Sequence, residues 1–270
     1  MSIFPLKRSL PAFLLKRSLP TSPLKRGVRF VGGSGLWDLA LIAVAFVLYY
    51  LVRGSMVQNI PDAYSRAFDI VALERRLGLF WEKEMQAWIM SSRFLVDLFN
   101  NVYLYLHFPA IVVIGLWLFL FHRRRYILFR NAFLISGAIG LIIFNWLPTA
   151  PPRLLPPFFG IIDTGLDFSA INYDIQPLAF VNKYAAMPSL HVGWNLLLGL
   201  AVFITSRNLL LRGLAVVMPI AMFLSTVVTG NHFIIDGLAG IVVALVGLAL
   251  ALAWRRRSDR FWGRFAAGSD

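Results

Sequence analysis

Long apolar stretches alternate with short polar breaks along this chain, and six of the stretches approach the length needed to cross a bilayer. A helix needs about 20 predominantly apolar residues to span the hydrocarbon core. Each stretch is bounded by charged residues, Pro or Gly. The pattern therefore predicts an all-α integral membrane protein with six transmembrane helices, at 36–52, 102–121, 131–147, 190–205, 214–229 and 233–254.

About fifty more polar residues separate the first two predicted spans, and they contain two amphipathic segments. In the first, Tyr64, Phe68 and Val71 recur at helical spacing, and Gly78 is expected to end the helix. The second segment, 81–90, contains two tryptophans. We expect both to be helices in the membrane interface. They either cover a functional site or simply pack there, and packing is the simpler expectation.

Composition and charge support a membrane protein. Hydrophobic residues make up 59% of the chain, charged residues 14%, and the mean hydropathy is +0.71. The amino terminus, the loop at 122–130, the turn at 206–213 and the tail after 254 carry 18 basic and three acidic residues. Basic loops stay on the cytoplasmic side, so both termini are predicted to be cytoplasmic. The net charge of +13 therefore reflects topology, and no nucleic-acid partner is expected.

The chain is predicted to have three parts. Residues 1–33 form a basic extension with a repeated Leu-Lys-Arg pattern, which is either disordered or an arm that contacts anionic lipid. Residues 34–256 form the six-span catalytic domain, and 257–270 form a basic cytoplasmic tail. The basic, Pro-broken first 30 residues do not predict a cleavable signal peptide. The absence of cysteine excludes disulfides and thiol chemistry.

Three polar elements that are far apart in the sequence are predicted to share the outer membrane face. They are Arg153, which follows the third span and a proline cluster, His191 at the start of the fourth span, and His232 at the start of the sixth. Titratable residues at the ends of apolar helices are candidate functional residues. Each has a plain alternative as an interfacial anchor or a packing residue. Their occurrence together on one face favours a site.

The chemistry that these residues suit is phosphate transfer. The starts of the fourth and sixth spans offer free N–H groups and positive dipole ends, and Ser189 is a candidate N-cap. Arg153 can bind phosphate oxygens bidentately. His232 and Asp236 are four apart, so the carboxylate can orient the imidazole as a nucleophile or base. His191, with an ordinary imidazole pKa near 6.5, can protonate a leaving oxygen.

These motifs resemble a known family. The segment 188–191 (Pro-Ser-Leu-His), the His232-x-x-x-Asp236 pair and the upstream Pro-Pro-Arg153 are similar to motifs of the type 2 phosphatidic acid phosphatase superfamily. The motifs are most similar to those of its inositol phosphorylceramide synthase (aureobasidin-target) branch, in which the sequences Gly-Asn-His and Ser-Leu-His are typical. The similarity extends from about residue 74 to residue 240.

The resemblance implies a six-helix membrane fold and a phosphohistidine intermediate. His232 would be the nucleophile, Asp236 its partner, and His191 the acid and base for the leaving group and the acceptor. The residues expected to bind phosphate are Arg153, Ser189, Asn231 and Gly230.

The chain departs from the phosphatase pattern at two positions. Trp146 stands where that pattern has a Lys, and Thr226 stands where it has an Arg. The transferase branch tolerates these changes, which favours that branch. Lys183, or Tyr103 and His107 in the second span, are candidate substrate contacts that could compensate. A packing role for His107 is equally consistent with its position.

The sequence thus predicts a membrane-embedded lipid phosphotransferase, with a phospholipid or lipid phosphate as substrate and a polyol as candidate acceptor. A lipid phosphate or prenyl diphosphate phosphatase that uses water is the first alternative. A non-catalytic subunit of a membrane complex is the second. No metal or other cofactor is expected, because the sequence lacks the carboxylate cluster of a magnesium site. The predicted location is the cell membrane, with the active site on the non-cytoplasmic face.

Overall fold

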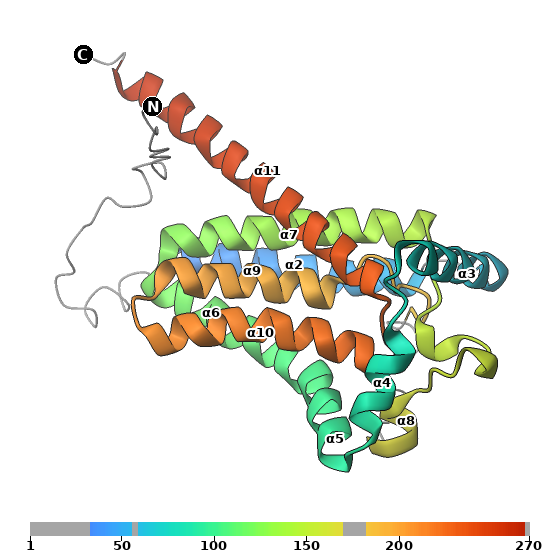
Figure 1. Cartoon of the computed structure of the whole chain (residues 1–270). Coiled ribbons are helices and arrows are strands. Elements are labelled where there is room, and N and C mark those ends of the chain that lie inside the picture. Colours follow the sequence, from blue (N-terminus) through green and yellow to red (C-terminus); the bar gives the residue numbers. More distant parts are fainter. Residues whose placement is uncertain (1–32, 56–58, 170–181, 268–270) are drawn as a thin grey trace, which may run out of the picture. The chain divides into compact units, whose positions relative to one another are not determined.

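A computed structural model of the chain describes residues 33–55, 59–169 and 182–267 (Figure 1). The chain divides into two units, 1–39 and 40–270. Of the first unit only 33–39, the start of a helix, is described. The predicted basic extension therefore lies outside the described residues, apart from Gly33. The site and all contacts below belong to the second unit.

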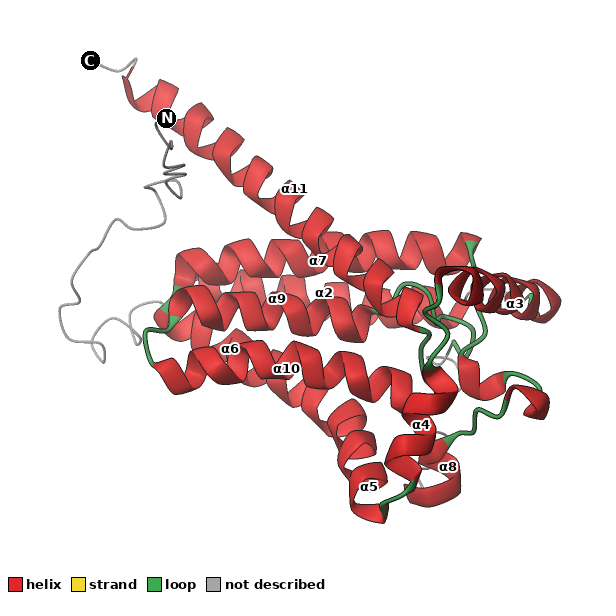
Figure 2. Cartoon of the chain, viewed as in Figure 1, coloured by secondary structure: helices red, strands yellow, loops and turns green. Residues whose placement is uncertain are grey.

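All regular elements of the described residues are helices, as predicted (Figure 2). Two short 3-10 turns, Pro152–Leu154 and Pro157–Phe159, follow the helix that ends at Trp146. The longer elements are α2 (Gly33–Ser55), α3 (Ile60–Leu77), α4 (Glu82–Met90), α5 (Arg93–Asn101), the π-helical turn η2 (Val102–Leu106), α6 (His107–Phe121), α7 (Arg123–Trp146), α8 (Thr164–Ser169), α9 (Leu190–Thr205), α10 (Leu209–Val228) and α11 (Ile234–Ala267).

Four described helical stretches are long and apolar enough to cross a membrane, and two apolar helices are shorter. The long stretches are Arg93–Phe121, Arg123–Trp146, Leu209–Val228 and Ile234–Arg257, and the shorter ones are Ala40–Tyr49 and Leu190–Thr205. The chain is therefore a multi-pass membrane protein by helix length and composition. At a rise of about 1.5 Å per residue, 16-residue α9 falls short of a hydrocarbon core of about 30 Å. Six spans and the orientation of the termini stay predictions.

The helices extend beyond the apolar runs that predicted them. The second predicted span begins with η2 and is extended back by α5 to Arg93, and the third begins at Arg123 instead of 131. The α11 helix continues to Ala267 and includes most of the predicted tail. A helix is held by backbone hydrogen bonds, so polar residues at the membrane edge continue it where hydropathy alone places its end.

The starts of α9 and α11 are in backbone contact. A Cβ atom added to Gly240 would lie 2.0 Å from the carbonyl oxygen of Ser189, and one added to Gly193 would lie 2.4 Å from that of Gly240. Such approaches are possible only without a side chain at these positions. The Ser189 N–H also donates to the Asp236 carbonyl at 2.9 Å. The backbone thus sets where the two helices begin relative to each other.

The two amphipathic segments form helices α3 and α4, as predicted, and α3 ends at Gly78 with φ of 69°. Both lie at the end of the bundle where α9 and α11 begin (Figure 1). The buried face of α3, with Ala63 and Ala67, packs in one cluster with Ala150 and Phe233. Both helices therefore pack, as expected, at the end of the bundle that carries the histidines, and they contact the start of α11 through Glu74 and Glu82.

Candidate active site

The structure brings His191 and His232 together. His191 lies in the first turn of α9, His232 lies two residues before α11, and their ring centroids are 5.9 Å apart. His232 is buried and His191 is half-buried. The two polar segments that the sequence placed on one face are thus close enough to act on one group.

Asp236 lies beside the His232 ring. Its Oδ2 is 3.5 Å from His232 Nδ1, and the same oxygen accepts the Phe233 N–H at 2.9 Å. The distance is longer than an ordinary N–H···O bond, and Nδ1 has no hydrogen-bond partner in the described part of the chain. Such contacts tighten when substrate binds. The carboxylate faces Nδ1, which leaves Nε2 as the nitrogen for chemistry.

Arg153 is held next to His232 by the loop that follows α7. Its backbone N–H donates to the Gly230 carbonyl at 2.9 Å, and its guanidinium donates to Asn231 Oδ1. The guanidinium also pairs with Asp163, with Nε 3.0 Å from Oδ2. The predicted cation is therefore part of the site. Asp163 was not predicted from the sequence, because it lies ten residues further on in an irregular segment.

Gly230 and Asn231, which were predicted to bind phosphate, make contacts within the protein. Gly230 has φ of +73°, and a Cβ atom there would lie 2.9 Å from the Ile162 carbonyl oxygen. Asn231 accepts from Arg153 through Oδ1 and donates through Nδ2 to Thr229 Oγ1 at 2.8 Å. Both residues thus hold Arg153 beside the segment that contains His232.

The first turn of α11 differs from the expectation that it offers free N–H groups to an anion. The Ile234 N–H donates to Glu82 Oε1 at 3.0 Å, and the Ile235 N–H donates to Glu74 Oε1 at 2.8 Å. Together with the Phe233 N–H on Asp236, three successive donors are occupied by carboxyl groups. The prediction was wrong for this helix because α3 and α4 supply acceptors that a local sequence pattern does not show.

The start of α9 has a different character. Ser189 is its N-cap residue, as predicted, but its side chain makes no capping hydrogen bond. Its Oγ is fully buried and has no hydrogen-bond partner within the described residues. A buried hydroxyl without a partner is costly, so this one is suited to bind an oxygen of a substrate.

Tyr103 and His107 border His191, as their candidate role requires. Their ring centroids lie 4.8 Å and 4.5 Å from that of His191. Asn195 Nδ2 approaches His107 Nδ1 at 2.8 Å and donates to the His191 carbonyl at 2.8 Å. Because an amide nitrogen donates, His107 Nδ1 is assigned as acceptor and Nε2 as the protonated nitrogen. Lys183 is exposed, and no hydrogen bond or ring contact joins it to the histidines in the described part of the chain.

The two positions where a phosphatase pattern has cations are occupied differently. Trp146 is 72% exposed at the end of α7. Thr226 is fully buried, and its carbonyl oxygen accepts the backbone N–H groups of Asn231 and His232, each at 3.0 Å. Thr226 therefore supports Asn231 and His232 through its backbone carbonyl, and its side chain supplies no charge to a phosphate.

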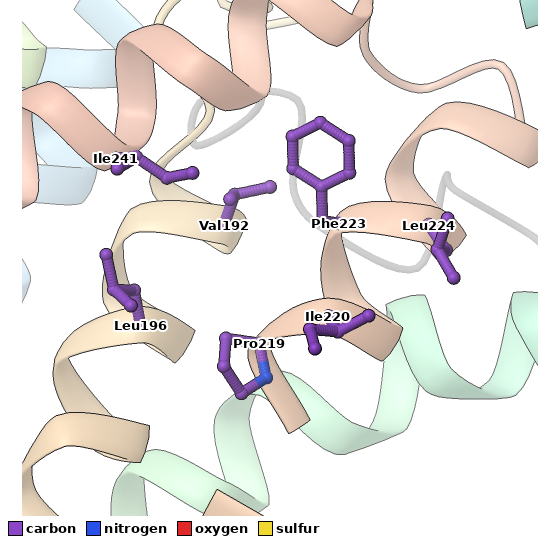
Figure 3. A pocket seen from close by; sticks show the side chains of 7 residues that line it. All are labelled: Val192, Leu196, Pro219, Ile220, Phe223, Leu224 and Ile241. Atoms are coloured by element: carbon purple, nitrogen blue, oxygen red, sulfur yellow. The ribbon is translucent and has the colours of Figure 1, made fainter. Parts of the chain in front are cut away.

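An apolar cavity of about 260 Å³ lies between α9, α10 and α11 (Figure 3). Val192 follows His191, and the Phe223 ring comes so close to Gly237 that a Cβ atom there would lie 2.5 Å from Cε2. The cavity is thus next to the polar site. Its lining residues are all apolar: Val192, Leu196, Pro219, Ile220, Phe223, Leu224 and Ile241.

The electrostatics at the start of α11 are set by buried carboxyl groups. Burial and, after it, the neighbouring Glu82 raise the pKa of Glu74 to about 9. Burial also raises the pKa of Glu82. Glu74 is therefore protonated at neutral pH, which reduces the negative charge close to the place where a phosphate would bind.

Comparison with known proteins yields one match. No curated protein and no solved structure matches the chain. The family model of the PAP2 superfamily matches residues 68–250, which include both histidines, Arg153 and Asp236. This match covers more than half of the chain and the whole geometry described above, and the chain therefore belongs to the PAP2 superfamily.

Proposed function

We propose that this chain is a lipid phosphotransferase that acts through a covalent phosphohistidine on His232. Membership of the PAP2 superfamily indicates phosphatase or phosphotransferase activity on lipid phosphates. The observation that carries the proposal is the pairing of His232 with Asp236 at 3.5 Å and with His191 at 5.9 Å between ring centroids. One histidine is thereby oriented by a carboxylate while another lies within reach of the same group.

In the first step, His232 Nε2 attacks the phosphorus atom of the lipid. A P–N bond forms, the bond from phosphorus to the leaving oxygen breaks, and His191 donates a proton to that oxygen. Asp236 accepts the Nδ1–H of His232 and stabilises the positive charge that develops on the ring. In the second step, His191 takes a proton from the acceptor hydroxyl, whose oxygen attacks phosphorus and releases His232.

Arg153 and Ser189 are the proposed phosphate ligands. Arg153 is held in place by Asp163 and Asn231, so its guanidinium needs little reorganisation to stabilise the charge on the transferred group. The buried Ser189 hydroxyl, next to His191, can donate to a phosphate oxygen. The apolar cavity between α9, α10 and α11 suits the first part of a lipid chain.

Transfer to an alcohol is favoured over hydrolysis by the residues that replace the two cations. Trp146 and Thr226 leave less positive charge around the phosphate than the phosphatase pattern provides. A phosphodiester carries fewer negative charges than a phosphomonoester, so it requires fewer cations for binding. We therefore propose a phosphodiester donor and a polyol acceptor, with the phosphatase reading as the alternative.

Product analysis tests the proposal. Purified protein in lipid nanodiscs is incubated with labelled phospholipids and lipid phosphates, with and without a polyol such as myo-inositol. A new phosphodiester that requires the polyol supports transfer, whereas free phosphate in its absence supports the phosphatase. His232→Ala and His191→Ala should both abolish turnover, and His232→Ala should abolish an acid-labile phosphoenzyme.

His122→Ala is the matched control, because this histidine lies at the opposite end of the bundle between α6 and α7. It should keep full activity. If wild type and both active-site variants are equally inert on every lipid, the enzyme proposal is rejected. A stoichiometric membrane partner that copurifies with inert protein would then favour the non-catalytic subunit.

We also propose that the site faces the non-cytoplasmic side of the cell membrane. The support is the placement of Arg153, His191 and His232 at the end of the bundle opposite the basic loops. The chain has no cysteine, so Phe158→Cys, at a residue 79% exposed near Arg153, gives a single reactive thiol. Labelling of intact cells by an impermeant maleimide supports this orientation, and labelling only after lysis contradicts it.

A further inference from the structure

Two carboxyl groups that belong to the amphipathic helices are bound to the backbone just after His232, the proposed nucleophile. Glu74 of α3 and Glu82 of α4 are fully buried, and each accepts one N–H group from the first turn of α11. They come from positions more than 150 residues away from that turn. No catalytic or phosphate-binding role in the proposed reaction involves these side chains.

The contacts of the two carboxyl groups call for one proton between them. Each uses Oε1 for a backbone N–H, and each Oε2 is buried without a donor in the described part of the chain. The side chains of Glu74 and Glu82 lie within hydrogen-bond reach of each other. Two carboxylates cannot bond to each other, whereas a carboxylic acid can donate to a carboxylate. One proton between the two residues therefore satisfies both groups.

The charges around the pair keep this proton in place. Glu74 feels the negative charges of Glu82 on α4 and of Asp236 on α11, and both raise its pKa, which lies at about 9. Glu82 likewise feels Asp236. Among the described residues, the charged groups that act on the pair from the elements packed against it are thus acidic. With the pKa of Glu74 at about 9, a proton stays on the pair at neutral pH, and a protonated Glu74 can donate to Glu82.

We propose that Glu74 and Glu82 are positioning residues, which as a proton-sharing pair hold the first turn of α11 so that the His232 imidazole stays aligned for attack. The N–H groups of a first helical turn have no partner within their own helix. Here the pair fixes those of Ile234 and Ile235, two and three residues after the nucleophile. The pair also keeps a second negative charge away from the phosphate. This inference rests on the proposed function of His232.

The closing experiment compares alanine and glutamine variants of the pair in full-length protein in nanodiscs. Glutamine keeps one acceptor oxygen and one donor, so Glu74→Gln mimics the protonated acid, whereas Glu74→Ala removes both. Glu74→Ala should lower kcat by on the order of 100-fold with little change in KM, because misplacement by about 1 Å has effects of this size. Glu74→Gln should restore most of kcat. Glu84→Ala, at an exposed position of α4, is the control and should be unchanged.

The pH profile separates positioning from a purely structural role. In wild type, kcat should fall as the pH rises through about 9, where Glu74 loses the shared proton. Glu74→Gln has no such proton and should lack this alkaline fall. An unchanged kcat in Glu74→Ala, or a Glu74→Gln variant that keeps the alkaline fall, overturns the inference.

Amide hydrogen exchange gives a readout that does not depend on turnover. The amides of Ile234 and Ile235 should exchange faster in Glu74→Ala and Glu82→Ala than in wild type, and at the wild-type rate in Glu74→Gln. If wild type is inactive on all lipids but this pattern is found, the proposed function fails and the positioning contact stands. If wild type is active and the amides are unaffected, the positioning inference alone fails.

Discussion

The starts of α9 and α11 lie side by side at one end of the bundle, yet their polar groups have opposite arrangements. At α11 the N–H groups of Phe233, Ile234 and Ile235 are each bound by a carboxyl group. At α9 the Ser189 hydroxyl has no partner among the described residues. A helix start is thus not by itself an anion site. Long-range acceptors decide whether its donors bind a ligand or fix the backbone.

Asp236→Asn should produce the largest effect, since Asp236 touches both helix starts. Its backbone carbonyl accepts from Ser189, and its side chain faces His232. The amide has no negative charge to stabilise the imidazolium, and its NH2 group can favour the wrong tautomer of His232, so kcat should fall on the order of 10³-fold or more. Steady-state kinetics on the labelled lipid measures this. Retained activity would show that the carboxylate serves only as a cap for Phe233.

Gly240→Ala should have the next largest effect. The new methyl group would lie 2.0 Å from the Ser189 carbonyl oxygen, so α9 and α11 must separate. We expect a loss of stability of about 1–3 kcal/mol and a fall in kcat of on the order of 100-fold. Thermal unfolding and kinetics measure the two quantities. Gly213→Ala, which has open space around it, is the control. Equal effects of both changes would mean that the close contact is unimportant.

Ser189→Ala sharpens the difference between the two helix starts. The hydroxyl has no partner to lose among the residues that the structure describes, so the thermal stability should not fall. A hydrogen bond to a charged oxygen contributes about 1.5–3 kcal/mol, so kcat/KM should fall about 10- to 100-fold. Glu82→Ala, in contrast, should lower both the thermal stability and kcat/KM, because it leaves the Ile234 N–H unpaired. A destabilised Ser189→Ala with normal kcat/KM would assign this serine to the fold and not to the substrate.

The smallest expected effect is on the pH dependence of stability. The pKa of Glu74 is raised from 4.5 to about 9 in the fold, so its protonated form favours the folded state. This contribution is complete below about pH 4.5 and is lost as the pH rises to about 9. The melting temperature of wild type should therefore fall relative to that of Glu74→Gln over this range. Parallel curves for the two proteins would contradict the shared proton.

The sequence predicted the helices and the meeting of the two histidines, because both follow from local patterns. Apolar runs define helices, Gly78 ends α3, and charge bias placed His191 and His232 at one end. The sequence reading also found Arg153. Its pairing with Asp163 was missed, because that contact depends on the path of an irregular loop.

The roles of Glu74 and Glu82 were missed for a different reason. Their carboxyl oxygens accept hydrogen bonds from residues more than 150 positions away in the sequence, and no sequence-spacing rule predicts such a contact. One signal was present in the sequence. Glu74 continues the buried face of α3 that includes Ala67, Ile70 and Val71, and a carboxyl group on an apolar helix face needs a partner. That pattern indicates a buried charge, and only the fold identifies what it binds.

The contact of Gly193 and Gly240 has a consequence for how this enzyme family can diversify. The approach of the helix starts that carry His191 and His232, the proposed acid and nucleophile, is set by main-chain atoms, while the adjoining cavity is lined by side chains such as Val192 and Phe223. Tail preference and catalytic alignment are therefore separately adjustable. Exchanging the lining residues offers a route to new lipid chains while the reaction centre is left intact.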